Sequence, residues 1–218
     1  MAVRDHLRLY LSLTLSLLLV LTLALPPAPA DAGARFLRVE QQLKDLGYPV
    51  GAVDGVQNAA SRRALCAWRR LEGRTAHRGK IEPAEFDAIL KTRRLPKVSR
   101  TSRHVVIDRT CQVLTYRKDG RVRRVFPVST GRPGKETPAG VYSVYRKRAG
   151  WHTSTLYPAN EPNMYNTMYF NGPVAMHGST KVPTYPASSG CVRLRPKHAD
   201  FLFPRVPLRM RVEVIGRW

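Results

Sequence analysis

Apolar side chains recur at helical spacing in one part of this chain and at every second position in another. Three helices are expected between residues 36 and 95: one with the apolar set Val39, Leu43 and Leu46, one capped by Ser61 with Leu65 and Trp68 turned inward, and one over residues 81–90. The stretch 91–103 is rich in basic residues and contains Pro96, which is typical of a linker. We therefore predict a small helical domain over residues 36–95 and a linker over residues 96–103.

From His104 onward the apolar period changes to two and helical patterns become scarce. Strands are expected at residues 105–107, 112–116, 122–128, 141–145, 168–170, 174–176 and 211–215, with one helix at residues 196–203. The pair Asp119-Gly120 suits a type I′ hairpin turn. Residues 148–168 are turn-rich and aromatic, which favours a mobile lid over a core element. The pattern predicts an α+β protein whose second domain, residues 104–216, is a mostly β sandwich or mixed sheet.

The first 32 residues have the pattern of an export signal. Arg4 and Arg8 precede an apolar stretch over residues 9–25, and two small-x-small cleavage sites follow, ending at Ala30 and Ala32. The alternative is an uncleaved anchor, although the apolar stretch falls just short of the roughly 20 residues that span a bilayer. We expect cleavage and a protein that is secreted, periplasmic or associated with a cell wall.

The chain is strongly basic, with 37 Lys and Arg against 15 Asp and Glu and a formal charge of +22. A protein with this charge gathers on polyanions. An exported protein rarely meets nucleic acid, so we expect the anionic polymers of a bacterial wall, or a lipid surface, as its polyanionic partners. The alternative interpretation is a solvated surface whose arginines reflect a genome rich in arginine codons.

Cys191 lies among small residues, in Ser188-Ser189-Gly190-Cys191, and His177 precedes it by 14 positions. A nearby imidazole can hold a cysteine sulfur as the reactive thiolate, and a small-residue turn leaves backbone N–H groups free to face an oxyanion. The alternative is a buried thiol with an unrelated loop histidine. No Cys-x-x-Cys or His-x-x-x-His pair favours a metal site, and we expect neither metal nor cofactor.

Three cysteines in an exported protein favour one disulfide and one remaining thiol. If Cys191 is the reactive residue, Cys66 and Cys111 remain as a pair that would join the helical domain to the β domain. The alternative is two separately buried thiols.

The segment His177-Gly178-Ser179, followed by Ser188-Ser189-Gly190-Cys191-Val192-Arg193, resembles the active-site signature of the cysteine-dependent L,D-transpeptidases of bacterial cell walls. Residues 126–131 and 137–140 are similar to the strand and turn segments that precede that site, so the resemblance extends over residues 104–216. Ser189 stands where many members have a second histidine, and His177 remains to take the sulfur proton.

The helical domain is similar to the peptidoglycan-binding domain often fused to these enzymes. The similarity is carried by Leu43, Leu46-Gly47-Tyr48, Gly51, Asp54-Gly55, Ser61, Ala64-Leu65 and Trp68. Two positions depart from that pattern: Asn58 stands where the family usually has Gly, and Arg69 where it often has Gln.

The resemblance implies that a peptidoglycan stem tetrapeptide acylates Cys191 with release of D-Ala, and that an amine of a second stem then takes the acyl group in a 3→3 cross-link. His177 would act as general acid and base, held by the backbone carbonyl of Gly178. The backbone N–H groups of Ser189, Gly190 and Cys191 would face the oxyanion. Water as acceptor would give an L,D-carboxypeptidase, and an inactive wall-binding protein is the remaining alternative.

Four further residues are candidates for binding the stem peptide. Arg193 would anchor a carboxylate or form a surface salt bridge, Ser179 and Ser188 would position the loop, and Tyr165 would line the donor groove. The predicted partners are peptidoglycan stem peptides and wall polyanions, without nucleic acid or a stable protein partner, so we expect a monomer. His152 is interpreted as a lid residue without a catalytic role.

Overall fold

The structure, a computed structural model, describes residues 29–100, 102–154 and 162–218, with side chains from residue 32 onward. The expected export signal over residues 1–32 falls almost entirely outside this part of the chain. Within it, no helix is both long and apolar enough to cross a membrane.

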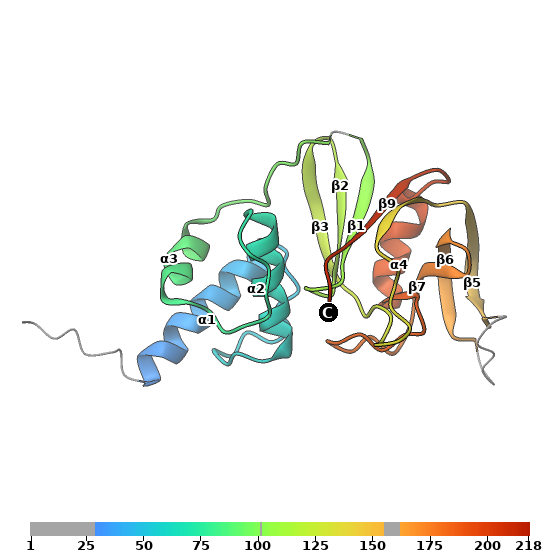
Figure 1. The fold of residues 1–218 in the computed structure, drawn as a ribbon. Coiled ribbons are helices and arrows are strands. Elements are labelled where there is room, and N and C mark those ends of the chain that lie inside the picture. The colour runs from blue at the N-terminus through green and yellow to red at the C-terminus, as the bar shows by residue number, and fades with distance from the viewer. Residues whose placement is uncertain (1–28, 101, 155–161) are drawn as a thin grey trace, which may run out of the picture.

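Three helices come first, as the sequence predicts: α1 (Pro29–Asp45), α2 (Ala59–Leu71) and α3 (Pro83–Lys91) (Figure 1). The start of α2 differs from the prediction, because its N-cap is Asn58. The Asn58 side chain accepts hydrogen bonds from the N–H groups of Ala60 and Ser61, and the Ser61 hydroxyl accepts one from the Asn58 N–H. Ser61 is therefore the third helical residue of a capping box rather than the cap itself.

The strands of the described residues form two sheets, which confirms the α+β prediction. The first sheet has the order β3-β2-β1-β9-β4 and consists of β1 (His104–Asp108), β2 (Val113–Lys118), β3 (Arg121–Pro127), β4 (Gly140–Ser143) and β9 (Arg211–Ile215). The second has the order β5-β6-β7-β8 and consists of β5 (Arg146–His152), β6 (Met164–Asn171), β7 (Val174–Gly178) and β8 (Val192–Leu194). β1 runs parallel to β9 and β7 parallel to β8.

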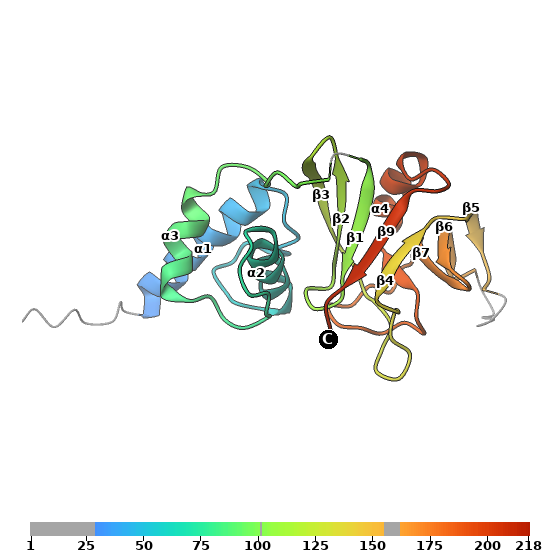
Figure 2. The same cartoon turned by 45° about the horizontal axis from the view of Figure 1, so that its top comes forward.

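The core of the β domain takes side chains from both sheets and from α4 (Pro196–Leu202), which a 3-10 turn (Phe203–Arg205) follows. Its fully buried members include Val105, Ile107, Leu114, Met168, Met176, Val192, Leu194, Leu202 and Val212. Figures 1 and 2 show α4 and the second sheet on one side of the first sheet, with the three N-terminal helices on the other. The first sheet is therefore covered on both faces.

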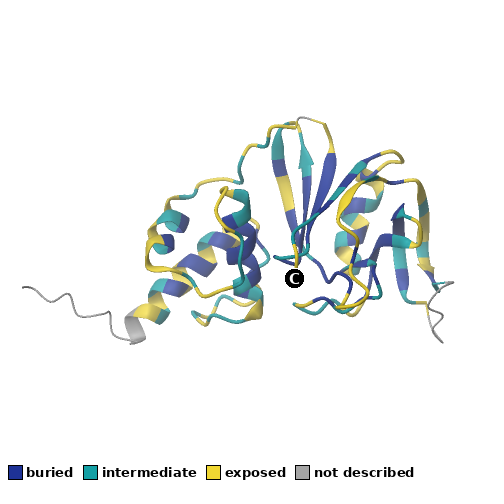
Figure 3. Cartoon of the chain, in the orientation of Figure 1, coloured by how far each residue is buried: buried dark blue, intermediate teal, exposed yellow. Residues whose placement is uncertain are grey.

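The helical unit and the first sheet share one apolar cluster. Leu65 and Trp68 of α2 belong to the same buried set as Val113, Val122 and Val125 of the sheet (Figure 3). This explains why all five residues of β1 are buried and why the strand reads as a nearly continuous apolar run.

Two stronger links join the helical unit to the end of β1 and to the loop that follows it. Cys66 and Cys111 form a disulfide bond, and the Arg70 guanidinium pairs with the buried Asp108 carboxylate at 2.8 Å. The expected linker also contacts the first sheet, since the Val98 N–H donates to the Gly120 carbonyl in the turn between β2 and β3.

The lid expected over residues 148–168 is wrong at both of its ends, which are strands. β5 and β6 pair in antiparallel fashion, with His152 opposite Met164, and residues 155–161 lie outside the described part of the chain. β5 is an edge strand whose side chains are mostly exposed, so its sequence lacks the apolar alternation by which strands are recognised. By contrast, Asp119 and Gly120 have φ of 53° and 65°, as a type I′ turn requires.

Candidate active site

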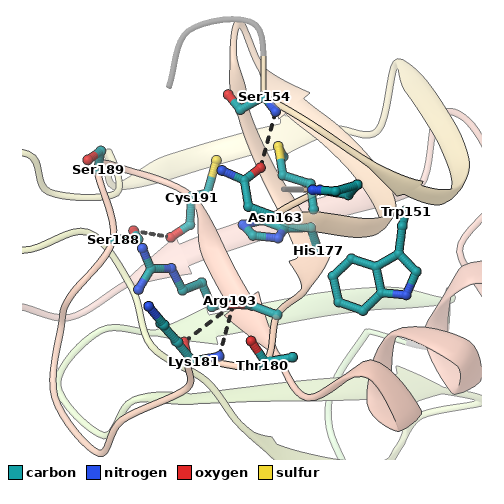
Figure 4. Close-up of a pocket in the computed structure, with 13 residues that line it drawn as sticks. Trp151, Ser154, Asn163, His177, Thr180, Lys181, Ser188, Ser189, Cys191 and Arg193 are labelled. Atoms are coloured by element: carbon teal, nitrogen blue, oxygen red, sulfur yellow. Dashed lines mark hydrogen bonds between the residues drawn. The ribbon is translucent and has the colours of Figure 1, made fainter. Parts of the chain in front are cut away.

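A cavity of about 760 Å³ opens beside β7 and the loop that precedes β8. The residues that line it include His177, Ser179, Lys181, Ser188, Ser189, Cys191 and Arg193, together with Trp151 and Asn163 from the β5–β6 side (Figure 4). Six of the residues selected from the sequence therefore line one cavity: His177, Ser179, Ser188, Ser189, Cys191 and Arg193. Gly178 and Gly190 are their neighbours in the sequence. Tyr165 does not line the cavity.

His177 is positioned by strand alternation. Its neighbours Met176 and Gly178 face the core and α4, so the imidazole between them faces the cavity. Nδ1 lies 3.0 Å from the Gly178 carbonyl oxygen. Because a carbonyl only accepts, Nδ1 carries the proton and Nε2 keeps a free lone pair.

Cys191 immediately precedes β8, which pairs with β7 so that Val192 lies opposite Met176. The half-buried thiol packs against an apolar cluster that includes Met164 and Ala175. Its hydrogen bond goes to the Pro173 carbonyl oxygen at 3.7 Å, and none joins it to the imidazole. Since Cys66 and Cys111 are bonded to each other, Cys191 is the free cysteine of the chain.

Burial of the pair favours its neutral form. Burial, with smaller contributions from the charges of Arg193 and His152, lowers the pKa of His177 to about 4 against the raising effect of the Gly178 carbonyl. Burial raises the pKa of the Cys191 thiol despite the opposing Ala175 backbone and Arg193 charge. The free site therefore holds a thiol and a neutral imidazole, which differs from the ion pair expected from the sequence.

The segment 128–137 supports the loop that leads to Cys191 through hydrogen bonds to residues 187–190. The buried Thr137 hydroxyl donates to the Gly190 carbonyl at 2.7 Å and accepts from the Gly131 N–H at 3.0 Å. The Thr130 carbonyl accepts from the N–H groups of Ala187 and Ser188. The two segments that resemble the family pattern upstream of the site thus act as the support for Cys191.

The expected oxyanion donors differ in availability. The Gly190 N–H donates to the Ser188 hydroxyl at 3.1 Å, so it is already engaged. The Ser189 N–H has no hydrogen-bond partner among the described residues, and its hydroxyl accepts from Arg132 at 2.8 Å. The small-residue turn therefore leaves the Ser189 amide open while its side chain turns toward Arg132.

Tyr165 differs from its expected role in the donor groove. It pairs with Gly178 across β6 and β7, on the side where a glycine Cβ would meet Tyr165 and Ala199 of α4. Its ring packs on Trp151 with centroids 4.9 Å apart, and its hydroxyl bonds to Asp200, which raises its pKa. Among the residues that the structure describes, Trp151 rather than Tyr165 is the aromatic side chain that lines the cavity.

The remaining candidates lie at the cavity wall. Ser188 donates to the Cys191 carbonyl, and Ser179 accepts from the Lys181 N–H at 3.2 Å, so both serines hold the loop. Arg193 is half-buried and burial lowers its pKa, although the Cys191 sulfur raises it.

Sequence reasoning missed Lys181 and Asn163 as residues of the cavity wall, and it placed His152 in a lid. Lys181 and Asn163 line the cavity, yet they stand in segments without apolar periodicity or motif. His152 is buried in β5, hydrogen-bonded to Thr167 at 3.2 Å, and close enough to lower the pKa of His177.

In the part of the chain that the structure describes, no group of three or more His, Cys, Asp or Glu is arranged to hold a metal ion.

A two-sheet domain with a histidine and a free thiol in one cavity, preceded by a helical unit, defines the class of protein. Residues 102–214 match the L,D-transpeptidase catalytic domain, YkuD. The L,D-transpeptidase of Xylanimonas cellulosilytica is 33% identical over 88% of this chain and 100% of that structure, with a TM-score of 0.59. The L,D-transpeptidase of Stackebrandtia nassauensis is 25% identical over 85% of this chain and 93% of that structure, with a TM-score of 0.53. The chain belongs to the L,D-transpeptidase family of peptidoglycan cross-linking proteins, and no curated protein matches it.

Proposed function

We propose that this protein is an exported peptidoglycan L,D-transpeptidase with Cys191 as nucleophile and His177 as general acid and base. The observation that carries the proposal is the arrangement of the two residues. His177 lies in β7, Cys191 immediately precedes the adjacent parallel strand β8, both line one cavity, and the Gly178 carbonyl holds the imidazole with Nε2 unprotonated. Family membership supplies the substrate class, the stem peptides of peptidoglycan.

The first half-reaction is acylation of Cys191 by a stem tetrapeptide. His177 Nε2 takes the thiol proton as Sγ attacks the carbonyl carbon of the diamino acid at position three. The negative oxygen faces the backbone N–H groups of Ser189 and Cys191, each contributing about 3 kcal/mol if well aligned. The bond to the terminal D-Ala then breaks, and the imidazolium gives its proton to the departing amine.

The second half-reaction returns the enzyme to its starting state. The side-chain amine of a second stem attacks the thioester carbonyl carbon and loses its proton to His177. The C–S bond then breaks, the imidazolium returns the proton to Sγ, and the 3→3 cross-linked product leaves. The same steps with water give an L,D-carboxypeptidase, which is the second candidate activity.

The charge of the cavity supports an anionic substrate. Lys181 and Arg193 line it, and no acidic side chain among the described residues does. Stem peptides carry carboxylates, which such cations attract and orient. The helical unit is proposed to bind the wall itself, in keeping with its resemblance to peptidoglycan-binding domains and with the charge of +22.

The test is intact-mass spectrometry of the oxidised protein after incubation with a carbapenem, followed by analysis of muropeptides from purified wall. We expect one adduct per chain and, with wall, either 3→3 dimers or trimmed tripeptides, which identify the acceptor. Cys191→Ala should give neither, and His177→Gln should lower turnover by roughly 10²–10⁴-fold.

The control is a folded protein without the nucleophile, so Cys191→Ala must keep the wild-type melting temperature and the Cys66–Cys111 bond. Wild-type protein that forms no adduct and releases no D-Ala from a disaccharide-tetrapeptide would overturn the enzymatic proposal and favour the wall-binding alternative.

A further inference from the structure

The loop over residues 179–188 forms one wall of the cavity, and its two ends are held by the β domain. At one end, the Ser179 N–H donates to the Leu194 carbonyl at 2.7 Å. At the other, the Tyr185 carbonyl accepts from the Ser129 hydroxyl at 2.7 Å, and the Ser188 N–H donates to Thr130. The middle of the loop is supported differently.

Within the described residues, the carbonyls of Pro183 and Thr184 receive hydrogen bonds from the helical unit alone. Arg63 of α2 donates through Nη2 to the Pro183 carbonyl at 3.2 Å, and Arg78 donates through Nη1 to the Thr184 carbonyl at 2.6 Å. These bonds connect positions 120 and 106 residues apart in the sequence. A cavity wall of the catalytic domain is therefore supported by side chains from outside that domain.

The burial of Arg63 costs more free energy than a purely structural role would justify. It is 4% exposed, its Nε has no hydrogen-bond partner, and the charges that act on it within the described residues are those of Arg78 and Arg195. Burial, together with these two like charges, lowers its pKa to about 10. A buried cation without a counter-ion costs free energy, and replacing such a group with an apolar one is often neutral or stabilising.

Arg78 connects three segments at once. Besides Thr184, its guanidinium donates to the Ala59 carbonyl at the start of α2 and lies 4.6 Å from the ring centroid of Trp218. A guanidinium suits this position because its planar fork donates in several fixed directions. The result is a rigid connection between the start of α2 and the cavity wall.

We infer that Arg63 and Arg78 of the helical unit are positioning residues for the proposed reaction, because they fix the loop 179–188 from which Lys181 and Ser188 line the cavity. The inference rests on the proposed function for its catalytic consequence. The helical unit thereby becomes part of the active-site architecture, in addition to any contact it makes with the wall.

The test compares the double variant Arg63→Met/Arg78→Met with wild type in the full oxidised chain. Hydrogen–deuterium exchange of the peptide covering residues 180–188 should become at least about tenfold faster. The rate of carbapenem acylation should fall about 10- to 100-fold, since an error of about 1 Å in a catalytic arrangement has that effect. The melting temperature should stay the same or rise, because buried unpaired charge has been removed.

Two matched variants complete the design. Arg38→Met removes an exposed cation from α1 and should change neither exchange nor acylation. Arg63→Lys/Arg78→Lys keeps donors within reach of the two carbonyls and should restore at least part of the lost rate.

Each outcome decides the inference. Unchanged exchange over residues 180–188, or faster exchange with unchanged acylation, overturns it, as does a loss of rate no larger than in Arg38→Met. If wild type itself is never acylated, the proposed function fails first, and the exchange experiment still reports whether the two arginines hold the loop.

Discussion

At the scale of single residues, the protonation state of the Cys191–His177 pair has a measurable consequence. Both groups are neutral at pH 7, because burial raises the pKa of the thiol and lowers that of the imidazole to about 4. Alkylation of Cys191 by iodoacetamide should therefore accelerate continuously from pH 6 to pH 9, following the thiolate fraction. His177→Gln should change that rate less than about threefold while suppressing substrate turnover by roughly 10²–10⁴-fold.

The contrary result is a plateau of alkylation near pH 6–7, which an imidazolium–thiolate pair would produce. Cys191→Ala provides the blank, since the other two cysteines are joined in the disulfide. A plateau would mean that the thiol is already ionised before substrate binds.

A second residue-scale prediction concerns the buried ion pair Arg69–Glu85. Arg69 bonds to both Glu85 oxygens and also donates to the carbonyls of His77 and Lys80, so this departure from the family pattern ties α2 to the chain before α3. Glu85→Gln leaves a buried cation unpaired and should lower the free energy of unfolding by about 3–5 kcal/mol at pH 7, measured in urea. Asp87→Asn, which breaks the exposed pair with Arg35, should cost at most about 1 kcal/mol.

The pH dependence of that loss follows from the lowered pKa of Glu85. Burial alone would raise this pKa, but the hydrogen bonds and charge of Arg69 outweigh it. The stabilisation is complete above the ordinary pKa of 4.5 and disappears as pH falls through the lower folded value. The difference between wild type and Glu85→Gln should therefore shrink in urea melts below pH 4. A difference that stays constant down to pH 2 would contradict the assignment.

At the scale of elements, the turn before β4 decides where Cys191 lies. A Cβ on Gly131 would come within 2.0 Å of the Lys135 carbonyl oxygen and 2.6 Å of the Thr137 nitrogen, both backbone atoms that cannot rotate away. Gly131→Ala should therefore displace Thr137, which supports Gly190, and lower carbapenem acylation at least about tenfold. Stopped-flow acylation kinetics measure this.

Gly134→Ala is the matched control in the same turn. Its φ is +75° and nothing lies within 4 Å of the added Cβ, so the substitution costs only the roughly 1–2 kcal/mol of a left-handed backbone. Equal acylation rates for the two alanine variants would show that the turn does not govern the position of the thiol.

The elements also show what the sequence could and could not predict. The three helices and the strands of the first sheet follow apolar periods, and Asp119-Gly120 specifies its own turn. β5 is an exposed edge and β8 has three residues, so neither carries a periodic signal. Residue chemistry, spacing and the family resemblance select His177 and Cys191 as candidates, and both line the cavity. The engaged Gly190 amide and the orientation of Tyr165 depend on contacts between distant segments, which no local pattern encodes.

At the scale of the whole molecule, the Cys66–Cys111 bond lies where the helical unit meets the first sheet. The two cysteines are separated by 45 positions in the sequence. Closing a loop of this length in the unfolded chain is expected to raise the free energy of unfolding by about 4 kcal/mol. The shared apolar cluster and the Arg70–Asp108 pair remain after its removal, so the protein should stay folded.

Cys66→Ala/Cys111→Ala should therefore lower the unfolding free energy by about 4 kcal/mol in urea while the native far-UV and near-UV circular dichroism spectra persist. Exchange over residues 180–188 should remain slow below the unfolding transition, because the hydrogen bonds of Arg63 and Arg78 are intact. The comparison is made in a Cys191→Ala background to prevent thiol exchange. Separation of the unfolding curve into two transitions would instead show that the disulfide, rather than the shared core, holds the helical unit to the sheet.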